Sequence, residues 1–350
     1  MLCGEYQNLP KDELLMTTIN HSLNETQPLL SIVAIGRNEE HNLGRLIASI
    51  SYLANILPNR PQTIFIDSAS TDKTCDIALT FFDEVYVIEE SPWLCASAGR
   101  FVGTKHARGK WVLYLDGDME LSRDFAEIVP PLIEKDEDVS GYIGSYINIF
   151  PDGARAANTF RCKKTGDMAQ AIGGSLLLRR DEVLKAGNWN PAIFSNEEME
   201  LYSRLRNGEK SIRFIEIPQV FHHAHKTGIF RALLSLIAPR FGLGKKWYGI
   251  GQILKARVQN HGLYSYIKME PYPFVCWTGI ISWLVCFLAG QWVLGTLILF
   301  FVFVLVSIRR RPKSFVIHSI QILPALIGLT KYNSKYTPSI ARSFKPGRSY

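Results

Sequence analysis

Two carboxylates follow directly on a strongly apolar run. Asp116 and Asp118, separated by Gly117, come after residues 111–115, WVLYL. Two anions this close repel each other unless a cation or a hydrogen-bond network holds them, so the stretch is either a strand end that turns into solvent or a metal site. Hard divalent cations prefer oxygen ligands and usually keep phosphate oxygens among them. The glycine between the acids lets a diphosphate approach the backbone closely, which would suit a nucleotide-diphosphate donor.

Polar side chains also follow two other apolar runs. Asn38 and Glu39 come after residues 29–36, LLSIVAIG, and Asp67 ends the run TIFID. The segment from Asp67 to Asp72, DSASTD, has a second interpretation, since Asp, Ser and Thr also form Asx-turns and helix caps. The residues alone do not decide whether 67–72 is part of a binding site or only a turn and helix cap.

A dense group of acids occupies residues 196–200, NEEME. One interpretation is a solvated helix N-terminus, where acids interact favourably with the helix dipole, and for Glu200 this explanation is at least as good as a functional one. Three acids in four residues also repel one another. A raised pKa on Glu197 or Glu198 would suit a general base.

Three histidines, His222, His223 and His225, lie at the end of a strand pair that we expect at 211–228. A single histidine there would usually be structural, but three within four residues favour a metal site. A mixed set of Asp and His ligands suits Mn²⁺ at least as well as Mg²⁺.

The elements that must position these groups alternate between strands and helices. This alternation predicts a parallel α/β sheet, and ligands of such sheets bind outside the carboxyl ends of the strands. The residues at those ends are Asn38, Glu39, Asp67, Asp72, Asp116 and Asp118. The expected strands are 29–36, 63–71, 84–90 and 111–118, with helices that begin near 39, 72 and 97, then a strand at 141–150 that leads into a mixed sheet and a helix at 196–208.

Composition and charge point to a membrane surface. The 350 residues are 47% hydrophobic, which supports a core and excludes wholesale disorder. The six cysteines form no CxxC pair that would indicate a zinc site or a disulfide framework. The formal net charge is +7, and residues 218–269 contain eight Lys or Arg and no Asp or Glu. Such a stretch suits the phosphate groups of nucleic acid or of anionic lipid.

An apolar segment without charge, 274–308, follows this basic stretch. It is long enough for one tilted membrane span, or for a tight helical hairpin broken near Gly290 and Gln291. The basic residues of 309–313 belong on the cytoplasmic side by the positive-inside tendency, so the hairpin is favoured. Residues 315–329 fit a third span, a re-entrant piece or an interfacial helix. We therefore expect the basic stretch to be juxtamembrane, without a nucleic-acid partner, and, because no signal sequence precedes it, the first 270 residues to be cytoplasmic.

Five motifs, taken together and in order, resemble the inverting glycosyltransferases of family 2, which have the GT-A nucleotide-sugar fold. The resemblance covers roughly residues 30–228, and any one motif alone would be weak. The motifs are IVAIGRNEEHNLGRLIASI, DSASTDKT, SAGRFVGTKHARGKWVLYLDGDMEL, GGSLLLRRDEVLKAGNWN and NEEMELYSRLR.

The resemblance implies a role for each residue near the donor. It places Asn38, Glu39 and Asp67 at the nucleoside and Arg100 near the donor phosphates. The DxD motif corresponds to Asp116 and Asp118. Asp118 would contact the metal directly, and Asp116 would bind the ribose or support the metal site.

The acid pair of the family, usually Glu-Asp, corresponds to Glu197-Glu198. Glu198 is then the implied catalytic base, although it is one methylene longer than the expected Asp and Glu197 stays an alternative. Arg204 matches the basic residue that follows on this helix. His222 and His223 both match a histidine that completes the metal site.

The implied function is metal-dependent transfer of a sugar, with inversion, from a nucleotide-sugar donor to an acceptor hydroxyl. The acceptor would be lipid-linked or a saccharide, such as a cell-envelope polysaccharide precursor, and the metal Mn²⁺ or Mg²⁺. The Gln-x-x-Arg-Trp motif of processive synthases is missing, and KKWYGIGQ at 245–252 does not replace it, so we expect a non-processive enzyme. Two alternatives stay open: a catalytically inactive GT-A-like membrane scaffold, and a sugar nucleotidyltransferase, although GRNEEHNLG lacks the Gly-rich basic loop of that class.

The expected fold is a GT-A α/β fold, a mostly parallel twisted sheet flanked by helices, with C-terminal transmembrane helices. The protein would be a multi-pass membrane protein whose catalytic domain lies in the cytoplasm. The expected parts are a loose arm at 1–28, the GT-A catalytic domain at 29–228, a basic juxtamembrane or interfacial segment at 229–272, a transmembrane hairpin with a third apolar helix at 273–330, and a basic tail at 331–350.

Overall fold

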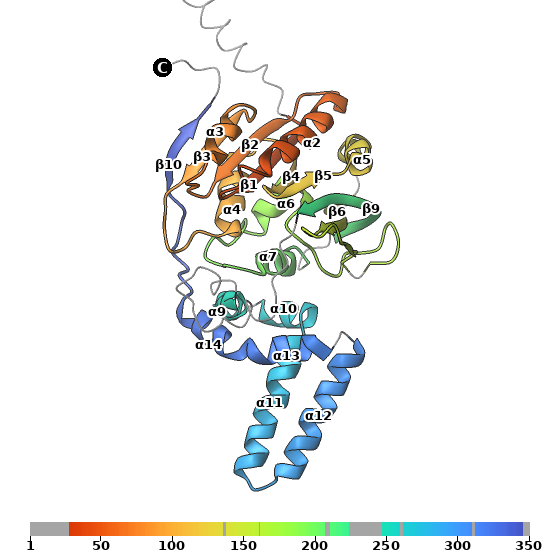
Figure 1. Cartoon of the computed structure of the whole chain (residues 1–350), viewed down its shortest axis with the longest axis vertical. Helices are drawn as coiled ribbons and strands as arrows, with labels where there is room; N and C mark the ends of the chain where they lie inside the picture. The colour runs from red at the N-terminus through yellow and green to blue at the C-terminus, as the bar shows by residue number, and fades with distance from the viewer. Residues whose placement is uncertain are drawn as a thin grey trace, which may run out of the picture.

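The structure, a computed structural model, places an α/β domain above a layer of helices from which a helical hairpin projects (Figure 1). The expected N-terminal arm, His225 and much of the basic stretch lie outside the residues that the structure describes. The described residues are 28–135, 138–160, 162–206, 211–223, 247–259, 262–309 and 312–345.

The first half of the sheet consists of four parallel strands in the order β3-β2-β1-β4. Their residues are largely apolar and buried, as is usual where helices cover both faces of a parallel sheet. In the register, Gly36 at the end of β1 pairs with Asp67 on one side, and Ile35 pairs with Asp116 on the other. The alternation of the sequence thus places these two acids at one edge of the sheet, as expected. The strands are β1 (Leu30–Gly36), β2 (Gln62–Asp67), β3 (Glu84–Ile88) and β4 (Trp111–Asp116).

The helices between these strands pack on the sheet through small and apolar residues. In α2 the buried stripe is Leu43, Leu46, Ile50 and Leu53. In α4 a Cβ atom at Gly103 would lie only 2.2 Å from Cγ1 of Val33, so the glycine lets this helix lie directly on β1. The helices are α2 (Leu43–Ile56), α3 (Thr74–Leu79), α4 (Ala96–His106) and α5 (Arg123–Glu134).

The second half of the sheet is mixed, so the expectation of a mostly parallel sheet holds only for β1 to β4. β8 runs antiparallel to β4, and β6 pairs antiparallel with β8 but parallel with β9. The expected strand pair at 211–228 is, over its described part, one strand, β9, whose register against β6 shifts near Pro218. Proline has no N–H to donate to the ladder. The strands are β5 (Met119–Leu121), β6 (Val139–Ile149), β7 (Arg155–Asn158), β8 (Leu176–Arg179) and β9 (Ser211–His223).

Short helices close the lower side of the domain, and two longer ones form the hairpin (Figure 1). The hairpin turns at Gly290, whose φ of +74° suits glycine. Within the described residues, α12 alone is long and apolar enough to cross a membrane, and α11 meets that test only together with α10, from which it is bent by 94°. The helices are α6 (Arg180–Lys185), α7 (Glu197–Leu205), α9 (Gly249–Gln259), α10 (Leu263–Met269), α11 (Tyr272–Leu288), α12 (Trp292–Arg309), α13 (Pro312–Ile320) and α14 (Ile322–Thr330).

The chain then returns from the helices to the sheet. A strand that the sequence analysis did not predict, β10 (Ile340–Phe344), pairs antiparallel with β3 and becomes the outermost strand on that side. Residues 331–339 run beside the domain to reach it (Figure 1).

Candidate active site

The site is built around one buried cation, Arg100. Its guanidinium donates from Nη2 to Oδ1 of Asp116 at 2.7 Å and from Nη1 to Oε1 of Glu197 at 2.8 Å. Nη1 also lies 3.6 Å from Oε1 of Glu198. One side chain, only 1% exposed, therefore joins the acid at the end of β4 to the acid pair at the start of α7.

The surroundings of Arg100 leave it in place and charged. The guanidinium carbon lies 5.1 Å from the ring centre of Trp189, within cation–π range. At Gly174 a Cβ atom would lie 2.4 Å from Nη2 of Arg100 and 2.6 Å from Oδ2 of Asp116, so no larger residue fits beside the pair. Burial lowers the pKa of Arg100, but the three nearby carboxylates raise it overall. The arginine is therefore a permanent positive charge.

The two acids of the pair differ in access and share a raised pKa. Burial, and then the negative charge of Glu197, raise the pKa of Glu198 to about 8. Burial also raises the pKa of Glu197, against the opposing effect of Arg100. The side chain of Glu197 is 7% exposed and that of Glu198 is 21% exposed. Glu198 is thus the more accessible of two carboxyl groups that bind a proton more readily than usual.

Glu200 and Arg204 belong to a different cluster. Arg204 donates to both carboxylate oxygens of Glu200, from Nε at 2.9 Å and from Nη2 at 2.7 Å, and Nη1 of Arg257 lies 3.8 Å from Oε1 of the same acid. Arg204 also donates to the carbonyl oxygens of Ala186 and Asn188. This cluster fixes α7 to its neighbours, and it shows that Arg257, 2% exposed, is not part of a basic surface.

Asp118 and His222 meet beside the acid at the end of β4. Oδ2 of Asp118 lies 3.2 Å from Nε2 of His222, and Nδ1 of the same ring lies 2.8 Å from Oδ1 of Asn148. The pairing of β5 with β9, in which Met119 lies opposite His222, brings them together. The hydrogen bond with Asp118 raises the pKa of His222. Two ligands of one octahedral cation lie ~3 Å apart when each is ~2.1 Å from it, so this pair fits a divalent metal.

His223 does not join this pair. Its Nε2 lies 3.6 Å from Oε2 of Glu120, and successive side chains of a strand point to opposite faces. Among the described residues, no group of three or more His, Cys, Asp or Glu is arranged to hold a metal ion. Asp118 and His222 would thus supply two ligands of a metal ion, and its other ligands would come from a substrate or water.

A cavity of about 270 Å³ opens at the carboxyl ends of β1 and β4. Asp116, Gly117 and Asp118 line one side of it, and the start of α4 lines another. The full lining is Ile35, Gly36, Arg37, Glu39, Ser68, Leu94, Cys95, Ala96, Asp116, Gly117 and Asp118. Its position is the one that the sequence predicts for a ligand site.

Asp67 lies beside this cavity and has an unsatisfied oxygen. Its Oδ2 accepts a hydrogen bond from the backbone N–H of Ser70 at 2.9 Å, while the buried Oδ1 has no hydrogen-bond partner among the described residues. A buried acceptor without a partner is costly. Asp67 itself is not part of the cavity lining, but the next residue, Ser68, is.

Asn38 and Glu39 shape the loop after β1. Asn38 has a positive φ of 58°, and its Oδ1 accepts from the backbone N–H of Thr71 at 2.9 Å, so it joins two loops. Glu39 lines the cavity, and its backbone N–H donates to Oγ1 of Thr74 at 2.6 Å. Asp72 accepts from the backbone N–H of Thr74 at 2.9 Å, as the turn interpretation of that residue expected.

Several residues of the site were missed by sequence reasoning. Trp189 and Gly174 contact Arg100, and Cys95 lines the cavity. Trp189 and Gly174 lie within the motif GGSLLLRRDEVLKAGNWN, so that motif carried a signal for them. Nothing about Cys95 marked it as a cavity residue.

Comparisons with known proteins agree with this fold. Residues 31–177 match the model of the family described as glycosyl transferase family 2. The crystal structure of S. aureus TarS 1-349 has a TM-score of 0.51 with this chain at 13% identity, over 86% of this chain and 90% of that one. This likeness shows the fold. Residues 31–177 are thus similar to the glycosyl transferase family 2 model, and the chain shares the α/β fold of TarS.

Two curated proteins resemble part of the chain. The 4,4'-diaponeurosporenoate glycosyltransferase of Staphylococcus haemolyticus is 27% identical over 106 residues, which are 29% of this chain and 27% of that protein. An uncharacterized glycosyltransferase of Rickettsia bellii is 31% identical over 98 residues, which are 28% of this chain and 30% of that protein. The chain thus spans less than a third of the length of the curated relatives it matches.

Proposed function

We propose that this protein is an inverting glycosyltransferase that moves one sugar from a nucleotide-diphosphate donor to an acceptor hydroxyl. The observation that carries the proposal is the joining, through Arg100, of Glu198 to Asp116 at the wall of the cavity. A single displacement requires a base that activates the acceptor hydroxyl on the side of the sugar carbon opposite the departing diphosphate. The family 2 match over residues 31–177 supports the same class of reaction.

Glu198 is the proposed base, in preference to Glu197. Glu197 is bound to Arg100 at 2.8 Å and is nearly inaccessible, whereas Glu198 is more distant from the arginine and more exposed. A raised pKa suits a general base because its conjugate acid then holds the proton that it removes. Glu198 would take the proton of the acceptor hydroxyl as the oxygen attacks the sugar.

Arg100 is proposed to position the acids. Its donors are directed to Asp116 and the acid pair, and it is almost wholly buried, so its charge acts on these carboxylates. By neutralising part of their repulsion it keeps Glu198 at a fixed place relative to the cavity. The donor contact implied by the resemblance would then be indirect, through Asp116.

The donor is proposed to bind in the cavity. The unsatisfied Oδ1 of Asp67 would accept a hydrogen bond from the nucleoside base, and the loop of Asn38 and Glu39 would cover it. Asp116 would support the ribose or the metal site. Asp118 and His222 would hold Mn²⁺ or Mg²⁺, which, when bound, neutralises charge on the diphosphate as it leaves.

Inversion is part of the proposal, because no residue is assigned as a nucleophile. If Glu198 activates the acceptor directly, one displacement replaces the bond to the donor phosphate by the bond to the acceptor oxygen. No nucleophilic residue is then needed. The absence of the Gln-x-x-Arg-Trp motif from the sequence supports transfer of one sugar at a time.

The hairpin supports a site at the cytoplasmic face of a membrane. Its large apolar side chains are exposed, among them Phe300 at 62%, Phe301 at 65% and Ile308 at 76%, and lipid would cover them. The layer of α9, α10, α13 and α14 lies between the hairpin and the domain (Figure 1). A lipid-linked acceptor, such as a cell-envelope polysaccharide precursor, would reach the site from this layer, and α13 and α14 would lie at the interface.

Donor hydrolysis by the full-length protein in detergent tests this proposal. A panel of nucleotide sugars is incubated with Mn²⁺, Mg²⁺ or EDTA, and release of the nucleoside diphosphate is measured. We expect metal-dependent release from one donor, lost in Asp118→Ala and kept in Glu120→Ala, the matched control on the neighbouring β5.

Two other outcomes would contradict the proposal. No release together with no donor or metal binding by calorimetry would indicate a catalytically inactive scaffold. Formation of a nucleotide sugar from sugar phosphate and nucleoside triphosphate would indicate a nucleotidyltransferase.

A further inference from the structure

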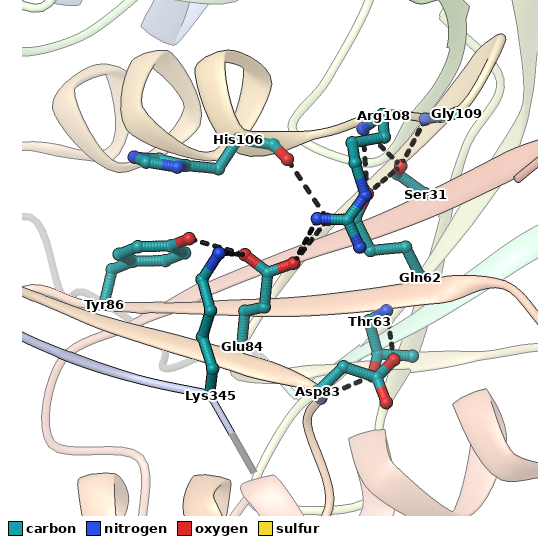
Figure 2. A network of polar contacts seen from close by, with 10 residues as sticks. All are labelled: Ser31, Gln62, Thr63, Asp83, Glu84, Tyr86, His106, Arg108, Gly109 and Lys345. Atoms are coloured by element: carbon teal, nitrogen blue, oxygen red, sulfur yellow. Dashed lines mark hydrogen bonds and ion pairs between the residues drawn. The ribbon is translucent and has the colours of Figure 1, made fainter. Parts of the chain in front are cut away.

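The segment 331–344, here called the C-terminal strap, is fixed to the domain at its far end. Its strand β10 pairs with β3, with Phe344 opposite Val85 and Arg342 opposite Val87. Just beyond the strand, Nζ of Lys345 lies 3.5 Å from Oε2 of the buried Glu84 (Figure 2). The other end of the strap follows directly on α14 and so continues from the helical layer.

Between these two ends the strap contacts the loop 89–95, which connects β3 to α4. The backbone N–H of Glu89 donates to the carbonyl oxygen of Ser339 at 2.8 Å. The hydroxyls of Ser91 and Tyr336 lie 3.2 Å apart, and the rings of Trp93 and Tyr336 have their centres 5.9 Å apart. This loop ends with residues that line the cavity.

The strap also contacts the loop 186–196, which leads into the acid pair. Nδ2 of Asn190 donates to the hydroxyl of Tyr332 at 3.1 Å. The buried side chain of Gln252 in α9 bridges the same two parts, since its Nε2 donates to the carbonyl oxygen of Lys331 at 3.3 Å and its Oε1 accepts from the N–H of Phe194 at 2.9 Å. Both loops that flank the site are thus bound to one segment.

The two loops also contact each other where the strap crosses them. Sγ of Cys95 donates to the carbonyl oxygen of Ile193 at 3.3 Å, and the rings of Trp93 and Phe194 have their centres 5.6 Å apart. Tyr336 adds a third ring to this group. The strap therefore completes a joint between the wall of the donor cavity and the loop that carries Glu197 and Glu198.

We propose that Tyr332 and Tyr336 of the C-terminal strap are positioning residues, which hold the base and the donor cavity at a fixed separation and connect both to the helical layer. The proposal rests on the proposed function for its effect on transfer. The ordering of the two loops does not depend on that function, because Tyr332 and Tyr336 contact the loops whether or not the site is catalytic. Loops without regular hydrogen bonding depend on such contacts for their order.

Hydrogen–deuterium exchange on the full-length protein in detergent tests the ordering of the two loops. Tyr332→Phe removes one hydroxyl, and we expect exchange in 186–196 to rise about fivefold. Tyr336→Ala removes a ring pair and a hydroxyl, and exchange in 89–95 should rise about tenfold. Tyr336→Phe keeps the ring and should give a smaller rise. Tyr52→Phe is the matched control, since Tyr52 donates to Glu127 at 2.9 Å on the exposed face of α2, remote from both loops.

The kinetic test separates positioning from general stability. Tyr336→Ala should raise KM for the donor more than it lowers kcat, since its loop lines the cavity. Tyr332→Phe should lower kcat about fivefold with little effect on the donor KM, since its loop leads to the base. Tyr52→Phe should change neither.

Unchanged exchange in both loops of the tyrosine variants would overturn the proposal. So would an equal rise throughout β1 and β4, because the strap would then stabilise the whole domain and position nothing in particular. If no donor is turned over at all, the proposed function fails, while the exchange result still decides whether the strap orders the loops.

Discussion

The two edges of the parallel sheet both contain a buried glutamate paired with an arginine, yet their chemistry differs. At the amino ends of the strands, Glu84 accepts from Gln62 at 2.8 Å and from Arg108 at 2.7 Å, and also from the hydroxyl of Tyr86 (Figure 2). Burial alone would raise the pKa of Glu84, but these hydrogen bonds lower it overall. At the carboxyl ends, burial raises the pKa of Glu198 to about 8.

The opposite pKa shifts at the two edges follow from the number of donors available to each carboxylate. Glu84 is one carboxylate that receives hydrogen bonds from three side chains, whereas Arg100 is one cation that three carboxylates share. A carboxylate with many donors is stabilised in its charged form. Carboxylates that share a single cation are less stabilised in their charged form. One of them therefore keeps a raised pKa. Burial is common to both edges, and the supply of donors decides whether the pKa of a glutamate is lowered or raised.

The largest effect is expected from removing the charge of the proposed base. Glu198→Gln should lower kcat for transfer by about 10²–10⁴-fold, the usual contribution of a general base. Glu198→Asp, which keeps a carboxylate, should retain more activity than Glu198→Gln, and Glu84→Gln should leave kcat within about twofold because it touches only the other edge. Steady-state kinetics of the purified variants checks this. Full activity in Glu198→Gln would remove this residue from the role.

The second effect concerns the shared cation. Arg100→Met should destabilise the protein by about 3–5 kcal/mol, because it leaves the buried Glu197 and the partly buried Asp116 and Glu198 without their cation. Arg108→Met, at the other edge, should cost about 1 kcal/mol, since this arginine is 52% exposed and Glu84 keeps its other donors. Thermal and denaturant unfolding in detergent measure both. Equal losses of stability in the two variants would mean that Arg100 matters no more to its carboxylates than Arg108 does to Glu84.

The third prediction is that the contributions of Glu84 and Glu198 to stability change with pH in opposite directions. The pKa of Glu84 lies below its ordinary 4.5, so its contribution is present above that pH and is lost as the pH falls below it. Glu84→Gln should therefore cost about 1–3 kcal/mol at pH 8 and less near pH 3.

The pKa of Glu198 lies above 4.5, so the wild-type protein loses stability relative to Glu198→Gln as the pH rises from 4.5 to about 8. Melting temperatures between pH 3 and pH 9 test both signs. The prediction for Glu198 would be contradicted if the difference in stability between Glu198→Gln and the wild-type protein were the same at every pH.

The smallest effect is in the pH profile of the reaction. A base with a pKa of about 8 is about one-tenth ionised at pH 7, so kcat/KM should be about tenfold lower at pH 7 than on the plateau above pH 9. Glu198→Gln should lack this limb, and Glu84→Gln should keep it. A profile that is flat between pH 6 and pH 9 in the wild-type protein would assign the rate to another step.

Much of the sheet could be predicted because its signals are local. Apolar runs rich in β-branched residues marked β1 to β4, and the chemistry of parallel sheets placed Asp67, Asp116 and Asp118 at one edge. β10 could not be predicted in this way. Its sequence, IARSF, is mostly exposed and has no apolar run, and its partner β3 is more than 240 residues earlier in the chain.

The functional side chains were harder to choose than the elements that carry them. Sequence alone did not decide between His222 and His223, because the choice depends on the register of β9 against β5, which decides which side chain lies beside Asp118. Glu200 lies two residues after Glu198, about 200° around the helix, and so contacts Arg204 and Arg257 instead of Arg100. The expectation that Arg257 belongs to a basic surface was wrong. This arginine is buried beside Glu200, which belongs to another helix.

The place of β10 has a consequence for how the chain matures. During synthesis β3 is made early, and its outer edge stays unpaired until the whole hairpin and the last strand have left the ribosome. An unpaired edge strand is a template for association with other chains, and contacts between distant segments form slowly. The nascent domain therefore needs protection for most of translation, and termination between residue 223 and β10 would release a protein in which the outer edge of β3 is open.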